Sequence, residues 1–230
     1  MLTLKEAIDV RQSHRRYTGA PLGEENARIL EDCIKKINEE SGLSIQLIQN
    51  SPETFAKSYC GIKGTDSLIA VVGNEDETYL LEKVGYYGEK VVLEATRLGL
   101  GTCWVSFTYD RDKCPCVIEP GQKLVMVIAV GEIAEDHQHE DEFGKQISHR
   151  NSRPIEYMYS SDGEPPEWFI DGMNAVAKAP SNLNAQPVKF FYSPSKVIAY
   201  VDGVPANQNI DLGIAELHFE LATGHKVFDK

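Results

Sequence analysis

The pattern of apolar and polar positions divides the chain into alternating helices and strands. Between residues 24 and 40, apolar side chains recur every three or four positions, which is the period of one helix face: Ile29, Leu30, Cys33, Ile34 and Ile37. Similar patterns predict further helices over residues 4–12, 78–98, 165–179 and 211–223. Apolar runs, alternating or continuous, predict strands over residues 43–48, 67–73, 102–108, 123–130, 187–192 and 196–201.

Two local signals support the ends of these helices. Thr3 and Glu6 have the spacing of a capping box, which predicts that the first helix begins at about residue 4. Gly99 and Gly101 follow the longest helical pattern, where glycine commonly provides the left-handed backbone of a helix end.

The order helix, strand, strand, helix occurs twice, over residues 24–98 and 165–223, which indicates an internal repeat. Gly88 and Gly99 are eleven positions apart, and so are Gly213 and Gly224. Side-chain identity between the copies is weak, so chance similarity of two α/β stretches remains the alternative. The first copy continues through another strand while the second stops early. We therefore expect a first half over residues 1–144 and a shortened second half over residues 145–230, packed as one unit that builds one ligand site.

Composition and charge narrow the function classes. The net charge of the 230 residues is −12, which argues against nucleic acid and anionic membranes as partners. The longest apolar run falls short of the roughly 18 residues that a membrane helix needs. The first residues lack the basic and apolar order of a secretory signal, and five cysteines are an odd, sparse set. These features favour a cytoplasmic protein.

Two histidines could suggest a metal site and two cysteines a redox motif, but each pair has a simpler explanation. His137 and His139 lie in an acidic stretch, residues 132–144, that reads as an exposed connection, and no further ligand completes a metal site. Cys114 and Cys116 lack the C-x-x-C spacing of redox motifs, so core or surface thiols are favoured. The sequence therefore predicts no metal centre.

Three stretches together resemble the nitroreductase superfamily of FMN-dependent flavoproteins. Residues 11–17 read RQSHRRY, similar to the family's R-x-S-x-R-x-[FY]. Residues 99–105 read GLGTCWV, similar to the segment that lies beside the isoalloxazine ring. Residues 179–187 read APSNLNAQP and match the family's A-P-S-x-x-N-x-Q-P, the most specific of the three.

The order of these stretches resembles the branch of putative nitroreductases in which two half-repeats are fused. Ordinary members carry the proline–serine motif soon after the arginine motif, whereas here it appears only in the second copy. The resemblance implies an α+β fold, a three-layer α/β/α sandwich with a mostly antiparallel sheet and two related halves. It also implies a pseudo-dimer within one chain, which is either a monomer or part of a homodimer.

The resemblance implies a flavin phosphate site around the first motif. Arg11 and Arg15 are four positions apart, so they can face one way at a helix end and bind phosphate oxygens. The alternative is a solvated helix end that also includes Arg16. Ser13 suits the pyrimidine edge or the ribityl chain. Arg153 matches a late basic residue of the family, with a surface arginine as the alternative, and Arg150 is a weaker candidate.

The ring system is expected to lie between the two other motifs. The resemblance places the ring beside two groups of residues: Cys103, Trp104, Val105 and Ser106 on one side, and Pro180, Ser181 and Asn184 on the other. A backbone N–H from about Val105 or Ser106 would face flavin N5. For Trp104, the alternative is a plain role in the core. Gln186 is expected to help hold the loop, with a purely structural role as its alternative.

The implied activity is hydride transfer, for which the flavin itself provides the chemistry. NAD(P)H is the expected co-substrate and a nitroaromatic or quinone the expected small-molecule acceptor. No catalytic side chain is required. Two other classes stay open: a flavin-binding carrier or sensor without significant turnover, and a scaffold that retains the fold without flavin.

Overall fold

The computed structural model describes residues 2–56, 61–134, 152–201 and 208–227. The helices of this part of the chain are α1 (Leu4–Val10), α2 (Glu24–Ser41), α3 (Pro52–Phe55), α4 (Leu80–Arg97), α6 (Glu167–Val176) and α7 (Gln208–Thr223). The strands are β1 (Ser44–Ile48), β2 (Ser67–Asn74), β3 (Leu100–Val105), β4 (Gln122–Glu132), β5 (Tyr159–Ser161), β6 (Val188–Ser193) and β7 (Lys196–Val201). Three short 3₁₀ turns are η1 (Arg111–Lys113), η2 (Ile155–Tyr157) and η3 (Asn182–Asn184). No helix in these ranges is long and apolar enough to cross a membrane.

The strands form two sheets. The larger has the order β1-β2-β4-β3 and is antiparallel throughout. The smaller has the order β5-β6-β7, in which β6 and β7 are antiparallel and only β5 runs parallel to its neighbour. The mixed α+β class with mostly antiparallel pairing is confirmed, and the pairing is divided between two sheets.

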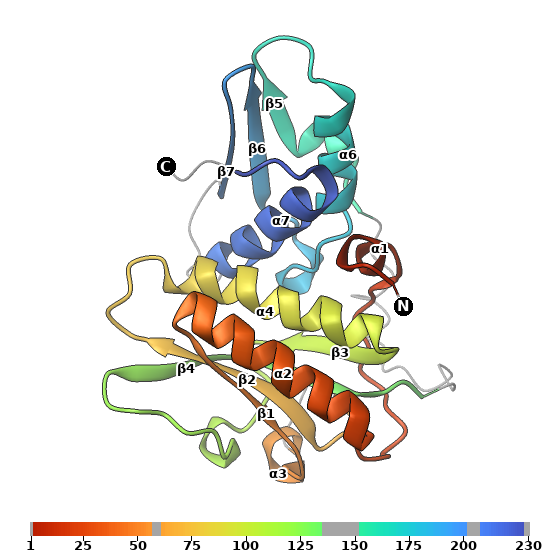
Figure 1. Ribbon diagram of the computed structural model, residues 1–230, viewed down its shortest axis with the longest axis vertical. Coiled ribbons are helices and arrows are strands. Elements are labelled where there is room, and N and C mark those ends of the chain that lie inside the picture. The colour runs from red at the N-terminus through yellow and green to blue at the C-terminus, as the bar shows by residue number, and fades with distance from the viewer. Residues whose placement is uncertain (1, 57–60, 135–151, 202–207, 228–230) are drawn as a thin grey trace.

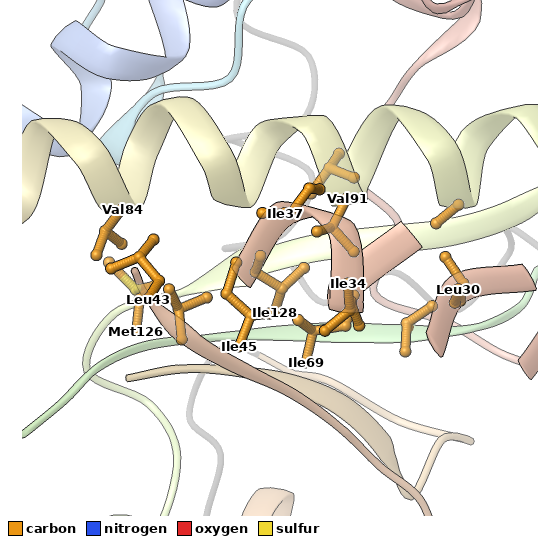
Figure 2. Close-up of a cluster of buried hydrophobic side chains, with 14 of the residues drawn as sticks. Leu30, Ile34, Ile37, Leu43, Ile45, Ile69, Val84, Val91, Met126 and Ile128 are labelled. Carbon is orange, nitrogen blue, oxygen red and sulfur yellow. The ribbon is translucent and has the colours of Figure 1, made fainter. Parts of the chain in front are cut away.

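Helices fill the space between the two sheets, as Figure 1 shows. In that view α4 crosses the middle of the molecule, with α2 and the larger sheet below it. The helices α7 and α6 lie above α4 and pack against the smaller sheet. The core of the lower half forms where the α2 and α4 faces meet the sheet, through side chains such as Leu30, Ile34, Ile69, Val91 and Ile128 (Figure 2).

Element boundaries follow local chemistry. The capping box at α1 is present, because the Thr3 hydroxyl accepts the Glu6 N–H at 3.1 Å and the Glu6 carboxylate accepts the Thr3 N–H at 2.7 Å. The strand expected over residues 102–108 instead spans Leu100–Val105, because its ladder with β4 ends at the Val105–Val127 pair. Ser106 therefore lies beyond the strand. The metal and basic candidates His137, His139 and Arg150 lie outside the described residues.

The helices α4 and α7 cross with their backbones in direct contact. A Cβ atom on Gly85 would overlap the Ile210 carbonyl, and one on Gly213 would overlap the Glu82 carbonyl. Glycine is required at both positions because a backbone atom, unlike the end of a flexible side chain, cannot move aside. This crossing sets the distance between the two halves of the core.

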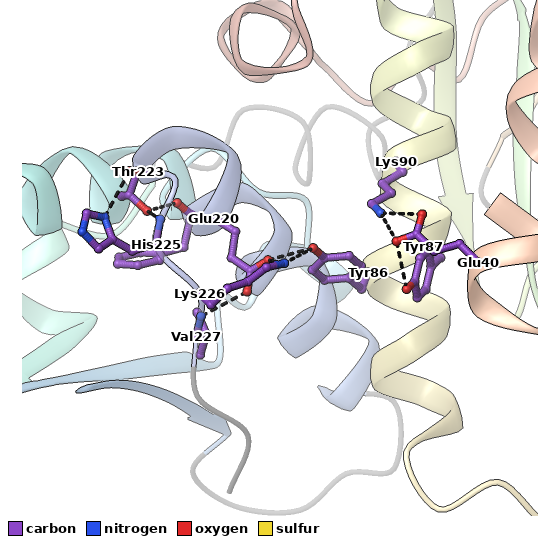
Figure 3. A network of polar contacts seen from close by, with 10 residues as sticks. Glu40, Tyr86, Tyr87, Lys90, Glu220, Thr223, His225, Lys226 and Val227 are labelled. Carbon is purple, nitrogen blue, oxygen red and sulfur yellow. Dashed lines mark hydrogen bonds and ion pairs between the residues drawn. The ribbon is translucent and has the colours of Figure 1, made fainter. Parts of the chain in front are cut away.

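Polar side chains connect α4 to both α7 and α2 (Figure 3). The Tyr86 hydroxyl on α4 donates to Glu220 on α7 at 2.7 Å, and Lys226 donates to the same carboxylate at 2.6 Å. Lys90 on α4 donates to Glu40 on α2 at 3.0 Å. Burial, aided by Glu220, raises the pKa of Tyr86 to about 12, so its hydroxyl stays protonated and remains a donor. The network fixes α2, α4 and α7 against one another.

The crossing predicts that Gly213→Ala destabilises the fold strongly. The added methyl must separate two helix backbones, so we expect a loss of about 1–3 kcal/mol in the free energy of unfolding, measured by urea denaturation. Gly23→Ala is the control for the added methyl, because a Cβ atom there meets nothing within 4 Å, and its cost is limited to the N-cap preference of α2. Equal stability of the two variants would show that the helices are not in backbone contact.

Candidate functional site

The structure brings the arginine motif and the proline–serine motif together. Arg11 follows the last residue of α1 and its side chain is only 10% exposed. Its Nη2 atom donates to the carbonyl of Lys178 at 3.2 Å, across a sequence separation of 167 residues. Lys178 directly precedes the segment Ala179–Pro187. The two motifs predicted to share one site therefore lie side by side.

One N–H donor of the Arg11 guanidinium, at Nε, is buried and makes no hydrogen bond within the part of the chain that the structure describes. This Nε atom lies 3.8 Å from the Oε1 atom of Glu89 on α4. Burial lowers the pKa of Arg11, and the charge of Glu89 opposes that change. Buried polar groups are nearly always hydrogen-bonded, so this N–H, which has only the Glu89 carboxylate near it among the described residues, is an exception.

The rest of the arginine motif is extended rather than helical. Ser13 forms a bridge with Thr102, where the His14 N–H donates to the Thr102 carbonyl at 2.8 Å. The Arg15 carbonyl accepts the Lys63 N–H at 2.9 Å. The expected helical juxtaposition of Arg11 and Arg15 is wrong, since α1 ends at Val10. Alternate residues of an extended segment face one side, so the R-x-S-x-R spacing still favours a common face.

The β3 motif begins beside Ser13 and is anchored in the core. Cys103 and Val105 are buried, at 4% and 2% exposure. Trp104 lies over Gly88, and its Nε1–H donates to the Oε2 atom of Glu89 at 2.9 Å. The indole is partly buried and packs against the core, while the backbone of β3 lies next to the arginine motif.

The proline–serine motif forms a turn with an unusual backbone. Leu183, Asn184 and Gln186 have φ values of 51°, 50° and 48°, a left-handed region that side chains other than glycine rarely adopt. Each such residue costs on the order of 1–3 kcal/mol unless its surroundings hold it in place. A backbone of this kind points to a functional constraint on the turn.

Hydrogen bonds from three other segments hold the turn. The Gln186 side chain ties the turn to two neighbouring segments. It donates to the Ala177 carbonyl at 3.1 Å and accepts the Arg153 N–H at 2.7 Å. The Gln186 N–H in turn donates to the Ser181 hydroxyl at 3.0 Å. The Asp211 carboxylate on α7 accepts the N–H of Asn182 at 3.1 Å. The interpretation of Gln186 as a residue that holds the loop is confirmed.

Arg153 lies at the edge of this arrangement. Its backbone binds Gln186, which places it beside the turn, while the residue as a whole is exposed. Both alternatives for its side chain stay open. Within the described ranges, no group of three His, Cys, Asp or Glu residues could hold a metal ion.

Behind the turn is a cavity of about 10 Å³, lined by Pro180, Ser181, Gln186 and Asp211 among others. That volume is about what one water molecule needs and far below the size of a cofactor pocket. This cavity is therefore too small to hold a cofactor. Inside the cavity wall, burial raises the pKa of the Asp211 carboxyl to about 7.

Comparison with known proteins identifies the family. The model of the family described as "Putative TM nitroreductase" matches residues 3–223. The chain belongs to this family. Membership of a nitroreductase family supports an oxidoreductase, and the sequence resemblance is confirmed at this level. No curated protein matches the chain.

One solved structure agrees with the fold of this nitroreductase-family chain, and two others are similar over a smaller part of it. A putative nitroreductase from Thermotoga maritima is 23% identical, with 96% of this chain and 83% of that one covered and a TM-score of 0.64. An FMN-dependent nitroreductase from Clostridium difficile is 16% identical, with coverage of 59% and 91% and a TM-score of 0.47. A nitroreductase with bound FMN from Bacteroides fragilis is 16% identical, with coverage of 62% and 94% and a TM-score of 0.47.

Three residues around the motifs were missed by sequence analysis: Glu89, Asp211 and His218. Each is at most 5% exposed and polar, and each lies on a helix face that is otherwise apolar. Glu89, for example, lies one turn from Gly85, Val92 and Leu93, all of them buried. A charged residue on the buried stripe of an amphipathic helix was the signal that could have found it.

The raised pKa of Asp211 predicts how stability changes with pH. The folded chain holds a proton on this carboxyl up to about pH 7, whereas an ordinary aspartate releases it near the model-compound value of 3.8. Stability should therefore fall as pH rises between these values, by about 1.4 kcal/mol per pH unit at most, and level off above them.

Asp211→Asn should flatten this slope, because the amide keeps an acceptor for Asn182 and carries no charge. Urea denaturation at pH 5 and pH 8 measures the difference, with the exposed Asp171→Asn as control. An unchanged slope in Asp211→Asn would exclude Asp211 as its source.

Proposed function

We propose that this protein is an FMN-dependent oxidoreductase that passes hydride from NAD(P)H to a small-molecule acceptor, such as a nitroaromatic or a quinone. The observation that carries the proposal is the contact between Arg11 and Lys178, which joins the arginine motif to the proline–serine turn. Family membership supports the reaction class.

The residues around this contact fit the parts of FMN. The guanidinium group of Arg11 suits phosphate oxygens, and the extended motif offers Ser13 and Arg15 from the same segment. Arg153 lies beside the turn, where its side chain would add a further cation. The ring would lie between the β3 segment, Cys103 to Ser106, and the turn residues Pro180, Ser181 and Asn184.

The chain's own residues bind and orient rather than react. Bound FMN would supply hydride transfer at its ring, which needs no acid or base from the protein. The turn is held rigid by Gln186 and Asp211, so its face is preorganised before a ligand arrives. Residues 1–144 would provide the arginine motif and β3, and residues 145–230 the turn, which gives one site per chain.

Spectroscopy and steady-state kinetics test this function. Protein reconstituted with FMN should carry about one flavin per chain and oxidise NADH or NADPH in the presence of menadione or a nitrofuran. Heat-denatured protein with the same free FMN is the control for flavin released into solution. Bound FMN that neither nicotinamide reduces would instead support a flavin carrier or sensor. A folded protein that takes up no FMN would exclude both.

The phosphate site predicts a selective loss of FMN. Arg11→Ala combined with Arg15→Ala should weaken FMN binding by about a hundredfold or more, since two guanidinium contacts to phosphate are removed. Riboflavin, which lacks the phosphate, should lose much less, as fluorescence titration would measure. Arg28→Ala is the control, because Arg28 on α2 is exposed and, among the residues that the structure describes, forms ion pairs with Glu25 and Asp32. Equal losses for both ligands would show that these arginines act on the fold and not on the phosphate.

A further inference from the structure

A buried polar cluster lies behind Arg11, where α1, α4 and α7 converge. Glu89 and His218 are both 0% exposed, and the His218 Nε2 atom is 2.9 Å from the Oε1 atom of Glu89. The Nε atom of Arg11 is 3.8 Å from the same oxygen. The second carboxylate oxygen, Oε2, accepts the indole N–H of Trp104. One carboxylate therefore contacts three segments that the proposed flavin site uses or rests on.

The hydrogen bonds of His218 demand an extra proton. Its Nδ1 atom is 3.2 Å from the carbonyl of Ala175 on α6, and its Nε2 atom faces the Glu89 carboxylate. A carbonyl and an ionised carboxylate only accept, whereas a neutral imidazole has one donor and one acceptor. Both contacts are satisfied only if the imidazole is doubly protonated or if Glu89 carries the proton and donates it to Nε2.

The net charge is the same in either case. With a doubly protonated His218, the charges of Arg11, His218 and Glu89 are +1, +1 and −1. With a protonated Glu89, only Arg11 is charged. The cluster therefore holds a net charge of +1 inside the protein, in a setting where its neighbours Ala7, Ile8, Leu93 and Leu217 are apolar and buried. A buried net charge is costly unless a counter-charge meets it.

The Nε–H of Arg11 makes no hydrogen bond within the described residues, and its nearest carboxylate oxygen, Oε1 of Glu89, lies 3.8 Å away. Glu89 alone would cancel the charge of Arg11 and leave no attraction for an anion. The proton on the Glu89–His218 pair prevents that cancellation.

We propose that Glu89 and His218 form a positioning pair for the flavin site, and that their shared proton keeps Arg11 attractive to the phosphate of the cofactor. This inference rests on the proposed function. Glu89 holds Arg11 and Trp104 in place, and His218 neutralises the carboxylate that does so. The pair touches neither substrate nor cofactor and acts through Arg11.

The proton count can be measured on the unaltered protein without flavin. Selective ¹⁵N-histidine and ¹³C-glutamate labelling with NMR at pH 7.5 should show His218 with both ring nitrogens protonated, or Glu89 as a protonated carboxyl. A His218 ring with one bare nitrogen beside an ionised Glu89 would overturn the proposal. This readout does not depend on FMN or on the folding of a variant.

Charge-changing variants then test the effect on binding. His218→Gln leaves Arg11 and an ionised Glu89, with a net charge of zero, so FMN affinity should fall about tenfold while riboflavin affinity stays unchanged. Glu89→Gln retains the net +1 of Arg11 with a neutral His218, but it weakens the contact that holds Arg11, so its FMN affinity should fall less than that of His218→Gln. The combined variant again has a net +1 and should regain part of the affinity that His218→Gln lost.

Restoration by a second substitution separates a charge effect from a structural one. A merely structural role predicts that the combined variant is worse than either single change, and this result would overturn the proposal. Wild-type FMN affinity in a folded His218→Gln would do the same. Glu94→Gln, on the same helix but paired with Arg97, is the matched control. If the wild type itself binds no FMN, the proposed function fails, and the NMR proton count still decides the state of the pair.

Discussion

The close crossing of α4 and α7 is the constraint on which the rest of the structure depends. The two helices touch backbone to backbone at Gly85 and Gly213, and each carries one sheet on its outer side. The residues of the candidate site are arranged around this crossing. Trp104 and Glu89 come from the side of the larger sheet, while the turn, Asp211 and His218 come from the other. Arg11 follows α1, which packs against both α4 and α7. A shift of one helix along its partner would therefore misalign the whole site.

α7 transmits this constraint to the turn. In its first turn, the Asp211 carboxylate of α7 accepts the N–H of Asn182. Two turns later, His218 of the same helix contacts Glu89. One rigid helix thus fixes the spacing between the turn and the carboxylate behind Arg11. The left-handed residues of the turn add strain, which the hydrogen bonds of Gln186 and Asp211 offset. The result is a turn whose shape is set by packing and hydrogen bonds.

Sequence analysis predicted the parts of the fold that depend on local chemistry. The capping box at Thr3, the apolar stripe of α2 and the order of helices and strands are all readable from spacing alone. The division into two sheets was not, because strand pairing depends on contacts between residues far apart in the chain. The end of β3 at Val105 was misplaced for the same reason, since its partner β4 decides where the ladder stops.

The candidate site shows the same division. The two motifs were found because their residue types are specific, and the structure shows that they meet at Arg11 and Lys178. The extended form of the arginine motif was not foreseen, because its bridge to Thr102 is a long-range contact. Glu89 and His218 lie outside any motif. Only the three-dimensional structure shows that these two polar residues, on separate helices, are in contact.

The contact between Arg11 and Lys178 has a consequence for assembly. Both residues belong to one polypeptide, so their encounter is unimolecular, and the intervening chain and the folded core fix their effective concentration. A site shared between separate subunits comes apart when the protein is diluted below the dissociation constant of the dimer. Here the two motifs stay together at any dilution at which the chain itself remains folded.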